Sequence, residues 1–519
     1  MLKRINEWGK RATLTVCSTT CLVVDLLPYR VNAIVDSLNE TIENITRSIN
    51  SNEPPGPLGW PVVGHLTMID YLKPQTTFNI WAQRYGPIFK LQLGSMPVIV
   101  LTDPYDIIDA FNNPALSGKP PLFVTTGIMD GCGILSVDRN LWANQREIIE
   151  TSLQNFQNWE VNGELVYYSI INRHVDLLLE QFFRKANGVH KFDAHPYVEL
   201  HVSNMMSELF LGRAFHLNDP EFKKQLSCSA LGSKLVNLFN PVNYFPVLRH
   251  WPNYAATYNT LRELKDIHHE FLDGIIQEHL DSGNEKKGLI NFIIEEMHRL
   301  GFPVTDPDNR KQLLHVAADL FGIASKTVST TIMWVLLHLT HMSAIQARVH
   351  AELDSAIGRN IKPRISQLLN LPFITACIFE TQRKCNVAPF GLPHWTCDDV
   401  QIGPYMIPKN TMVIGFLYVV HTDKAYWRSP EMFEPDRFIN PGGDIRDISC
   451  FMPYLVGQRQ CLAGSIAHTA LMTITGNLLQ VFSFSPGNDW SFQPKEIAGL
   501  RLMPKDYFVR LIPRLLLPE

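Results

Sequence analysis

The sequence lacks several common marks of nucleotide-binding, zinc-binding and nucleic-acid-binding proteins. No Gly-x-Gly-x-x-Gly motif follows an expected strand, and no GxxxxGK[ST] loop is present, so neither nucleotide-binding mode is expected. The nine cysteines are odd in number and scattered, without Cys-x-x-Cys pairs or zinc-like His/Cys clusters. This argues against a disulfide framework and a zinc site, and it favours a reducing compartment. The net charge of −4 gives no support for nucleic-acid binding.

The N-terminus lacks a clear membrane span. Residues 12–24 are uncharged and follow four basic residues, but this stretch is shorter than the ~20 apolar residues that a spanning helix needs. An apolar stripe at helical spacing follows over residues 31–49. This segment could lie on a membrane surface, pack on its own domain, or be a transit or signal peptide. The turn-prone run Pro54–Pro57 predicts a boundary between an anchor segment, 1–53, and a folded body, 54–519.

The body has enough apolar sequence for a large core, because 45% of the 519 residues are hydrophobic and 18% are charged. The runs 88–93 and 96–101, joined by Gly-Ser, predict a β-hairpin. The pattern is then mainly helical to about residue 385, and 386–460 reads as short strands and coil. The most apolar long helix is expected over 313–341. Asp319 and Lys326 within it argue against a membrane span.

Cys461 stands on a loop that could present a metal-binding thiolate. The loop is Phe451-Met-Pro-Tyr-Leu-Val-Gly-Gln-Arg-Gln-Cys461, and residues 462–479 are expected to form a helix. Exposed N–H groups at a helix start stabilise a thiolate. Gly457 would let the backbone pass close to a flat ligand, and Arg459 could bind a carboxylate of that ligand. One thiolate and one arginine suit haem. The alternative is a buried structural cysteine on a turn.

The loop resembles the haem-binding signature of the cytochrome P-450 family. Tyr454, Gly457, Arg459, Cys461 and Ala463 occupy its aromatic, Gly, Arg, Cys and Gly places. Tyr454 stands where Phe is usual, and Ala463 stands where Gly is usual. The resemblance covers roughly residues 54 to 519 and is closest to the microsomal animal branch. It implies a mainly α fold with a small β region and one haem b buried between helices, its iron bound axially by the Cys461 thiolate.

Two further motifs gain meaning from this resemblance. Glu380-Thr-Gln-Arg383 places two charges one helical turn apart, and with Arg437 it implies a buried ionic triad that holds the cysteine loop in register. Groups near the haem propionates are also implied: Trp142, Arg146, His394, Arg459 and, less securely matched, Lys119. Taken alone, His394 would be read as an ordinary loop histidine.

The central helix departs from the family pattern. Residues 323–328 align with the oxygen-activation motif, in which an acid precedes a threonine pair. Thr327 keeps the hydroxyl that would face dioxygen, whereas Lys326 replaces the acid and Val328 the second threonine. Burial that lowered the pKa of Lys326 would let it relay protons. Alternatively, it points into solvent and water serves Thr327. Asp319 is expected on the same face, but too far for direct transfer.

The substrate side is expected to be apolar. The resemblance places Val124, Ile323, Ala324 and Leu392 above the haem, and it likens the aromatic segment 239–251 to a lid. Loop packing is the alternative for that segment.

The implied function is insertion of one oxygen atom of O2 into an apolar small molecule, such as a steroid, fatty acid, terpenoid or xenobiotic. NADPH would supply electrons through a partner reductase, with cytochrome b5 as a second donor to consider. The protein would lie at the endoplasmic reticulum membrane with its folded body in the cytosol, or alternatively in mitochondria. A haem-thiolate isomerase or dehydratase acting on a peroxide, and a non-catalytic haem protein, stay open.

Overall fold

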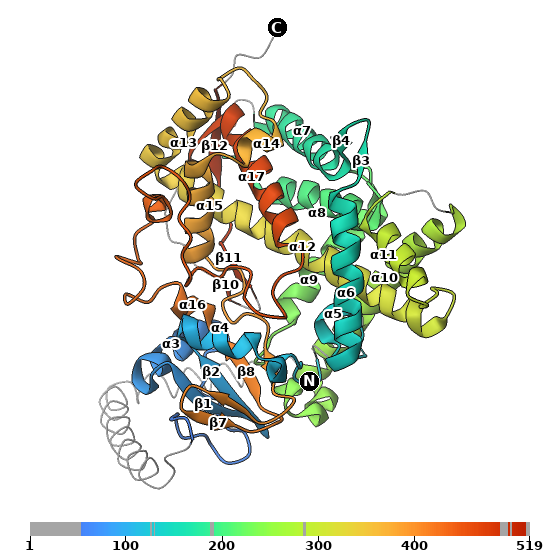
Figure 1. Ribbon diagram of the computed structural model, residues 1–519, viewed down its shortest axis with the longest axis vertical. Coiled ribbons are helices and arrows are strands. Elements are labelled where there is room, and N and C mark those ends of the chain that lie inside the picture. The colour runs from blue at the N-terminus through green and yellow to red at the C-terminus, as the bar shows by residue number, and fades with distance from the viewer. Residues whose placement is uncertain are drawn as a thin grey trace, which may run out of the picture.

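A computed structural model describes residues 53–124, 127–128, 130–186, 191–283, 287–487, 497–498 and 501–514. Helices fill one side of the molecule and a small sheet lies at the other end (Figure 1). The long helices are α3 Pro74–Tyr85, α4 Pro104–Asn112, α6 Arg139–Gln157, α7 Val166–Ala186, α8 His195–Leu211, α9 Pro220–Leu235, α10 Pro252–Asp281, α11 Leu289–Arg299, α12 Pro307–His341, α13 Ser343–Ala356, α15 Pro372–Lys384 and α17 Gly464–Val481. The fold is therefore mainly α with a small β region, as expected.

Short helical turns connect these elements. They are α5 Gly133–Ser136, α14 Ile365–Leu368, α16 Leu417–Val420, η1 Pro114–Leu116, η2 Pro241–Asn243, η3 Pro246–His250 and η4 Pro435–Phe438. The lid-like segment 239–251 thus contains two 3-10 turns, and within it Phe239 and Tyr244 are buried whereas Val247 and Trp251 are exposed.

The main sheet is built on the expected hairpin. Strands β1 Ile88–Leu93 and β2 Met96–Leu101 pair antiparallel, with Leu93 opposite Met96. Gly94 has φ +60°, the conformation that the first residue of such a turn requires. β8 Met412–Gly415 adds parallel to β2, and β5 His394–Trp395 adds antiparallel to β8. His394, from the Pro- and Gly-rich region, is therefore fixed on the edge strand of the main sheet.

The remaining strands form two-stranded ribbons. They are β3 Glu160–Val161 with β4 Glu164–Leu165, β6 Val400–Ile402 with β7 Tyr405–Ile407, β9 Phe482–Pro486 with β12 Val509–Pro513, and β10 Ile497–Ala498 with β11 Leu502–Met503.

Helix α12 runs through the centre of the helical side (Figure 1). Asp306 caps it by accepting from the amides of Asp308 and Asn309, and Pro307 fits its first turn. By length and composition α12 could cross a membrane, but 72% of its most apolar window is buried inside the protein. From 325 to 340 every residue except Thr327 is buried. The helix is therefore a core element, and the opening at Thr327 is local.

Candidate active site

The Cys461 loop is a tight turn that leads into α17. The Cys461 amide donates to the Tyr454 carbonyl at 3.0 Å, and the Gln460 amide donates to the Gly457 carbonyl at 3.1 Å. The Tyr454 hydroxyl accepts from Gln382 Nε2 at 3.1 Å, a bond that the usual Phe could not make. Ala463 directly precedes α17 as its N-cap residue. These bonds fix the cysteine at the helix start, with its side chain exposed.

The Cys461 thiol has opposing influences on its protonation. Its side chain is solvent-accessible, yet the protein atoms crowded around it still raise the pKa of the thiol. A hydrogen bond from the Ala463 amide and the charge of Arg146 lower that pKa. The helix start therefore favours the thiolate as expected but does not overcome desolvation, so a bound metal cation would be needed to deprotonate the group fully.

Gly457 lies against the backbone of Phe111, where a side chain could not fit. Its φ is +80°, and a Cβ there would lie 2.1 Å from the Phe111 carbonyl oxygen. The approach of Gly457 to a flat ligand stays a prediction; its close neighbour in this structure is the backbone at the end of α4. The Gln458 amide donates to the same carbonyl at 3.3 Å. Gly457 thus docks the cysteine loop onto α4.

Arg459 lies buried among backbone carbonyls. Its Nε donates to Ser117 O at 2.8 Å, Nη1 to Ile134 O at 3.2 Å and Nη2 to Val137 O at 2.8 Å. Its guanidinium carbon stands 4.2 Å from the Trp142 ring centroid. None of these acceptors is a carboxylate. The arginine is therefore held in place by neutral partners, with its positive charge only partly offset.

Arg146, one turn beyond Trp142 on α6, faces the same loop. Its Nη1 donates to Gln460 O at 2.7 Å, and its Nε pairs with Glu150 at 2.6 Å. This contact brings α6 against the backbone next to the cysteine, and the Arg146 charge favours the thiolate.

His394 and Lys119 complete a basic cluster with Arg459. The His394 ring stacks on Phe111 with 3.8 Å between centroids, and its Nδ1 lies 2.8 Å from Leu116 O. Its Nε2 is buried without a hydrogen-bond partner among the described residues. Lys119 Nζ donates to Pro393 O at 3.0 Å. Burial is the main cause that lowers the pKa of all three groups, Arg459 to about 9. Arg459 further lowers the pKa of Lys119 and His394, and Arg146 lowers that of Arg459, while Asp138 partly opposes the shift for Lys119 and Arg459.

These residues fit a haem. Buried Arg459 and His394 and half-buried Lys119 have, among the described residues, one carboxylate, Asp138, acting on them, so the site is short of negative charge. The Nε2 of His394 also has no hydrogen-bond partner in the part of the chain that the structure describes. Two haem propionates would supply the missing negative charge and a hydrogen-bond partner for His394. A thiol at the open end of the loop supplies the donor that a thiolate-ligated iron needs.

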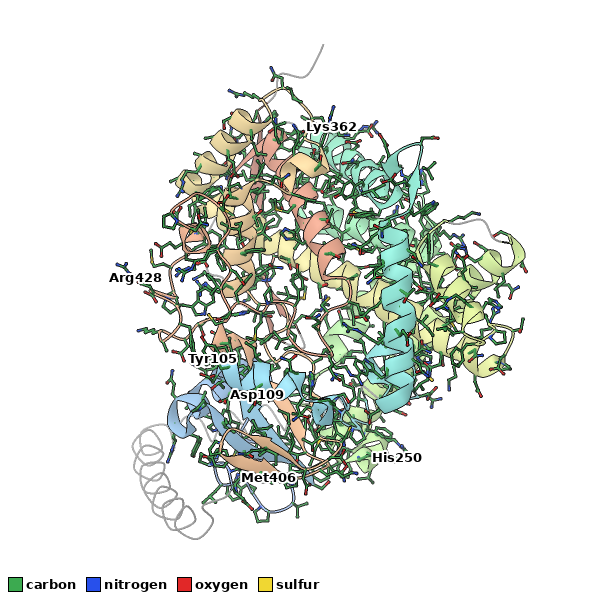
Figure 2. All side chains as sticks on the ribbon, viewed as in Figure 1. Tyr105, Asp109, His250, Lys362, Met406 and Arg428 are labelled. Carbon is green, nitrogen blue, oxygen red and sulfur yellow. The ribbon has the colours of Figure 1, made fainter. Side chains whose placement is uncertain are left out.

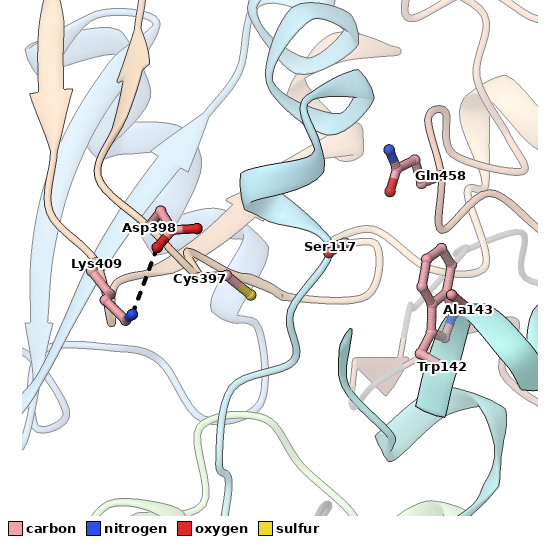
Figure 3. A pocket seen from close by; sticks show the side chains of 7 residues that line it. All are labelled: Ser117, Trp142, Ala143, Cys397, Asp398, Lys409 and Gln458. Carbon is pink, nitrogen blue, oxygen red and sulfur yellow. Dashed lines mark ion pairs between the residues drawn. The ribbon is translucent and has the colours of Figure 1, made fainter. Parts of the chain in front are cut away.

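A separate cavity of about 340 Å³ borders the outer side of this cluster (Figure 3). It is lined by Ser117, Trp142, Ala143, Cys397, Asp398, Lys409 and Gln458. Lys409 and Asp398 face each other across 3.6 Å. Cys461 is not among the lining residues, so this cavity is a neighbour of the cluster and not the cysteine site itself.

The three charges of the Glu380 motif meet in the core. Arg383 binds both carboxylate oxygens of Glu380, at 2.7 and 2.8 Å, and donates to the carbonyls of His421 and Pro430. Arg437 Nε lies 3.1 Å from Glu380 but is not aligned for a hydrogen bond. Glu380 and Arg383 side chains are fully buried. The group ties α15 to the segment that leads to the cysteine loop.

On α12, Thr327 and Lys326 have different environments. Thr327 is half-buried, and its hydroxyl donates to Ile323 O at 2.9 Å. Lys326 is buried and forms an ion pair with Glu199 of α8. The alternative in which Lys326 points into solvent is therefore wrong. Burial and nearby Arg501 lower the pKa of Lys326 to about 8, whereas the Glu199 carboxylate in contact favours the ammonium.

Asp319 is committed elsewhere. Its Oδ2 accepts from the amides of Ile134 and Leu135 at 2.9 and 3.0 Å, so it caps α5. Burial raises the pKa of Asp319 to about 7, although these two hydrogen bonds oppose the shift. α5 is thereby held at its start by Asp319 and at its end by Arg459, which donates to Ile134 and Val137.

The pKa of Asp319 gives a first prediction. Because it lies above the ordinary value of 3.8, the folded chain holds a proton between these pH values that the unfolded chain releases. The stability from this group is full below about pH 3.8 and is lost as pH rises through 7. We expect Asp319→Asn to flatten the decline in melting temperature from about pH 4 to 7. Equal slopes of melting temperature against pH for both proteins would show that the pKa of the Asp319 carboxyl group is not raised.

The expected substrate-facing residues divide into two groups. Ile323 and Leu392 are exposed, at 43% and 42%, and Ala324 is half-buried, although their neighbours on α12 are core. Val124 is 3% exposed and packs in an apolar cluster with Val242 and Leu261. Val124 thus packs against η2, and its contact with substrate stays a prediction.

Comparison with known proteins places this geometry in a family. The family model for cytochrome P450 matches residues 54–511. Cytochrome P450 18a1 of Drosophila melanogaster is 28% identical, covering 83% of this chain and 81% of the relative. Cytochrome P450 1A1 of Macaca fascicularis is 28% identical over 83% and 86%, and cytochrome P450 306a1 of Drosophila melanogaster is 28% identical over 88% of both chains. The chain therefore belongs to the cytochrome P450 family and is a haem-thiolate oxidoreductase.

Proposed function

We propose that the chain inserts one oxygen atom of O2 into an apolar small molecule of the steroid, fatty acid, terpenoid or xenobiotic class. NADPH supplies the electrons through a partner reductase, with cytochrome b5 as a further donor to test. The observation that carries this proposal is the combination of an accessible Cys461 thiol with a buried basic cluster short of negative charge.

In this proposal Cys461 would bind the iron of haem b, Arg459 and Lys119 would offset the charge of the propionates, and His394 would hydrogen-bond to one of them. Trp142 and Arg146 hold the edge of that cluster, the first by stacking on Arg459 and the second by binding the loop backbone. The conformation of the cysteine loop is fixed by Gly457, Tyr454 and Ala463. When bound, the haem supplies the oxygen chemistry. The triad of Glu380, Arg383 and Arg437 acts at a distance, by fixing the loop's approach.

The substrate side is assigned to the open part of α12. Ile323, Ala324 and Leu392 offer apolar contact, so they would orient a hydrophobic molecule and exclude water from it. Thr327 is the one residue from 325 to 340 that is not buried. Its hydroxyl is therefore the group that holds a proton at this face.

A membrane surface is proposed at the sheet end of the molecule, and the endoplasmic reticulum is the proposed location, with mitochondria as the alternative. Large apolar side chains are exposed at Trp60, Val62 and Leu72. Val247 and Trp251 are also exposed, and His250 between them lies at the sheet end of the molecule, as does Met406 of β7 (Figure 2). Tyr71 joins the two stretches through its hydrogen bond with Asn237. The proposed anchor segment lies outside the described residues, apart from Glu53.

The test is the carbon monoxide difference spectrum of the protein. Reduction by NADPH through a microsomal reductase is expected to give a strongly red-shifted band, as does chemical reduction. A band with the chemical reductant alone would contradict the proposed electron source, and no red-shifted band with either would contradict thiolate ligation.

A second function is favoured by one observation. Position 326 carries a lysine where the family's oxygen-activation motif carries an acid, so a peroxide-using isomerase or dehydratase, which needs no proton supply for O2, is the competing proposal. Conversion of a lipid hydroperoxide in the absence of any reductase would favour it. A haem protein without turnover would convert neither kind of substrate.

A further inference from the structure

Lys326 of α12 forms an ion pair with Glu199 of α8, a partner that the sequence did not indicate. Glu199 lies 127 positions earlier in the chain, and α8, which carries it, packs along α12. The Lys326 side chain is 8% exposed and the Glu199 side chain 20%. Solvent therefore reaches the Glu199 carboxylate more readily than the Lys326 ammonium.

Among the described residues, few other charged groups act on the pair. Arg501 repels the Lys326 ammonium, and its Nη1 is buried without a partner among the described residues. His195, one turn before Glu199 on α8, also lies within electrostatic range of Lys326; burial lowers its pKa, whereas Asp193 and Asp506 raise it. Of the residues that the structure describes, Glu199 is thus the carboxylate in contact with Lys326.

We infer that Glu199 is a positioning residue for Lys326, and that this ion pair between helices takes the place of the acid that α12 lacks beside Thr327. This inference rests on the proposed monooxygenase function. Lys326 gives up one proton toward the Thr327 face of α12 and regains one from solvent on the partly open Glu199 side.

The geometry supports this division of roles. Adjacent helical residues diverge by about 100°, so Lys326 and Thr327 lie on neighbouring faces of α12. Lys326 points to α8, and the described hydrogen bonds of the Thr327 side chain go to α12 carbonyls. A proton therefore passes between them through water admitted at the open face. An ammonium that loses its proton near neutral pH is a suitable donor, and the pKa of Lys326 is about 8.

The experiment follows the fate of electrons without an organic substrate. Reduction of O2 with two electrons and two protons gives hydrogen peroxide, and reduction with four of each gives two waters. Insufficient proton supply favours peroxide. In the haem-loaded wild type with NADPH and reductase, the peroxide fraction is expected to rise as pH passes through the pKa of Lys326, which burial and Arg501 lower to about 8 and which the Glu199 carboxylate shifts upward from there.

Glu199→Gln removes the counter-charge and keeps the shape. Because the ammonium loses its stabilising anion, the midpoint of the peroxide rise is expected to move down by about one pH unit, a tenfold change in proton affinity. Glu199→Asp should restore most of the shift. The swap Lys326→Glu/Glu199→Lys keeps the pair but places the acid on α12, and it should move the midpoint to the range of a carboxyl group.

Thermal unfolding of the same variants separates positioning from simple structural support. A cycle of Glu199→Gln, Lys326→Met and the double variant measures the coupling of the pair. Lower melting temperatures with an unmoved peroxide midpoint would overturn the inference, because the pair would then be a tie between helices only. A wild type that shows no thiolate carbonyl band overturns the proposed function along with it, whereas a normal band with a pH-independent peroxide fraction overturns the inference alone.

Discussion

Cys461→Ala is expected to remove the red-shifted carbonyl band and all NADPH-dependent oxygenation, with little loss of folding. The side chain of Cys461 is exposed, and the loop is held by backbone bonds of Tyr454 and Gly457 that alanine leaves intact. Sulfur is the only atom of this side chain that can bind iron. The visible spectrum of the reduced carbonyl complex and the far-ultraviolet circular dichroism of the variant measure the two effects.

The matched control is Cys228→Ala. Cys228 is a partly exposed cysteine on α9, outside the site. This variant should keep the wild-type band. A Cys461→Ala protein that also kept the band would refute the assignment of the ligand, and a variant that lost its helical signal would show that Cys461 supports the fold.

Glu380→Ala and Arg383→Ala are each expected to cost about 3–5 kcal/mol of stability, because each leaves the partner as a buried, unpaired charge. Both side chains are fully buried, and Arg383 also holds the carbonyls of His421 and Pro430. Loss on this scale can unfold a protein of ordinary stability. We therefore expect little soluble protein and no haem uptake. Denaturant unfolding and the haem absorbance per milligram measure the result.

Arg348→Ala is the control for this prediction. Arg348 makes a two-bond ion pair with Asp436, but both side chains are about half exposed. An exposed pair contributes roughly 0–1 kcal/mol. A soluble, fully haem-loaded Glu380→Ala protein, with stability like that of Arg348→Ala, would contradict the structural role of the triad.

Elements whose signals are local could be predicted from the sequence. The hairpin at 88–101 followed from two apolar runs and a Gly-Ser turn, and its bounds agree with β1 and β2. The helix after Cys461 was predicted within two residues of α17 at each end. The start of α12 was placed too late, at 313 instead of Pro307, because its first turn is polar and only the Asp306-Pro307 cap marks it.

The site could be predicted where fixed spacing carries the information. Arg459, Trp142 and His394 were named from motifs, and the structure brings them together. Contacts between distant segments were not accessible in this way. Nothing in the sequence around Glu199 indicates that it meets Lys326, and nothing around Phe111 indicates that its carbonyl meets Gly457. The sequence placed Asp319 on the face of Thr327, too far for direct proton transfer, but it gave no sign that the carboxylate caps α5.

The contact between Gly457 and Phe111 bears on how such chains change during evolution. A side chain at 457 would strike the Phe111 carbonyl whether or not a cofactor is present. A descendant that had lost its haem would therefore still be selected to keep this glycine, while Cys461, whose side chain is exposed, would be free to drift. In degenerate copies of this gene, a retained glycine would reflect the constraint of the fold, whereas a retained Cys461 would reflect selection for iron binding.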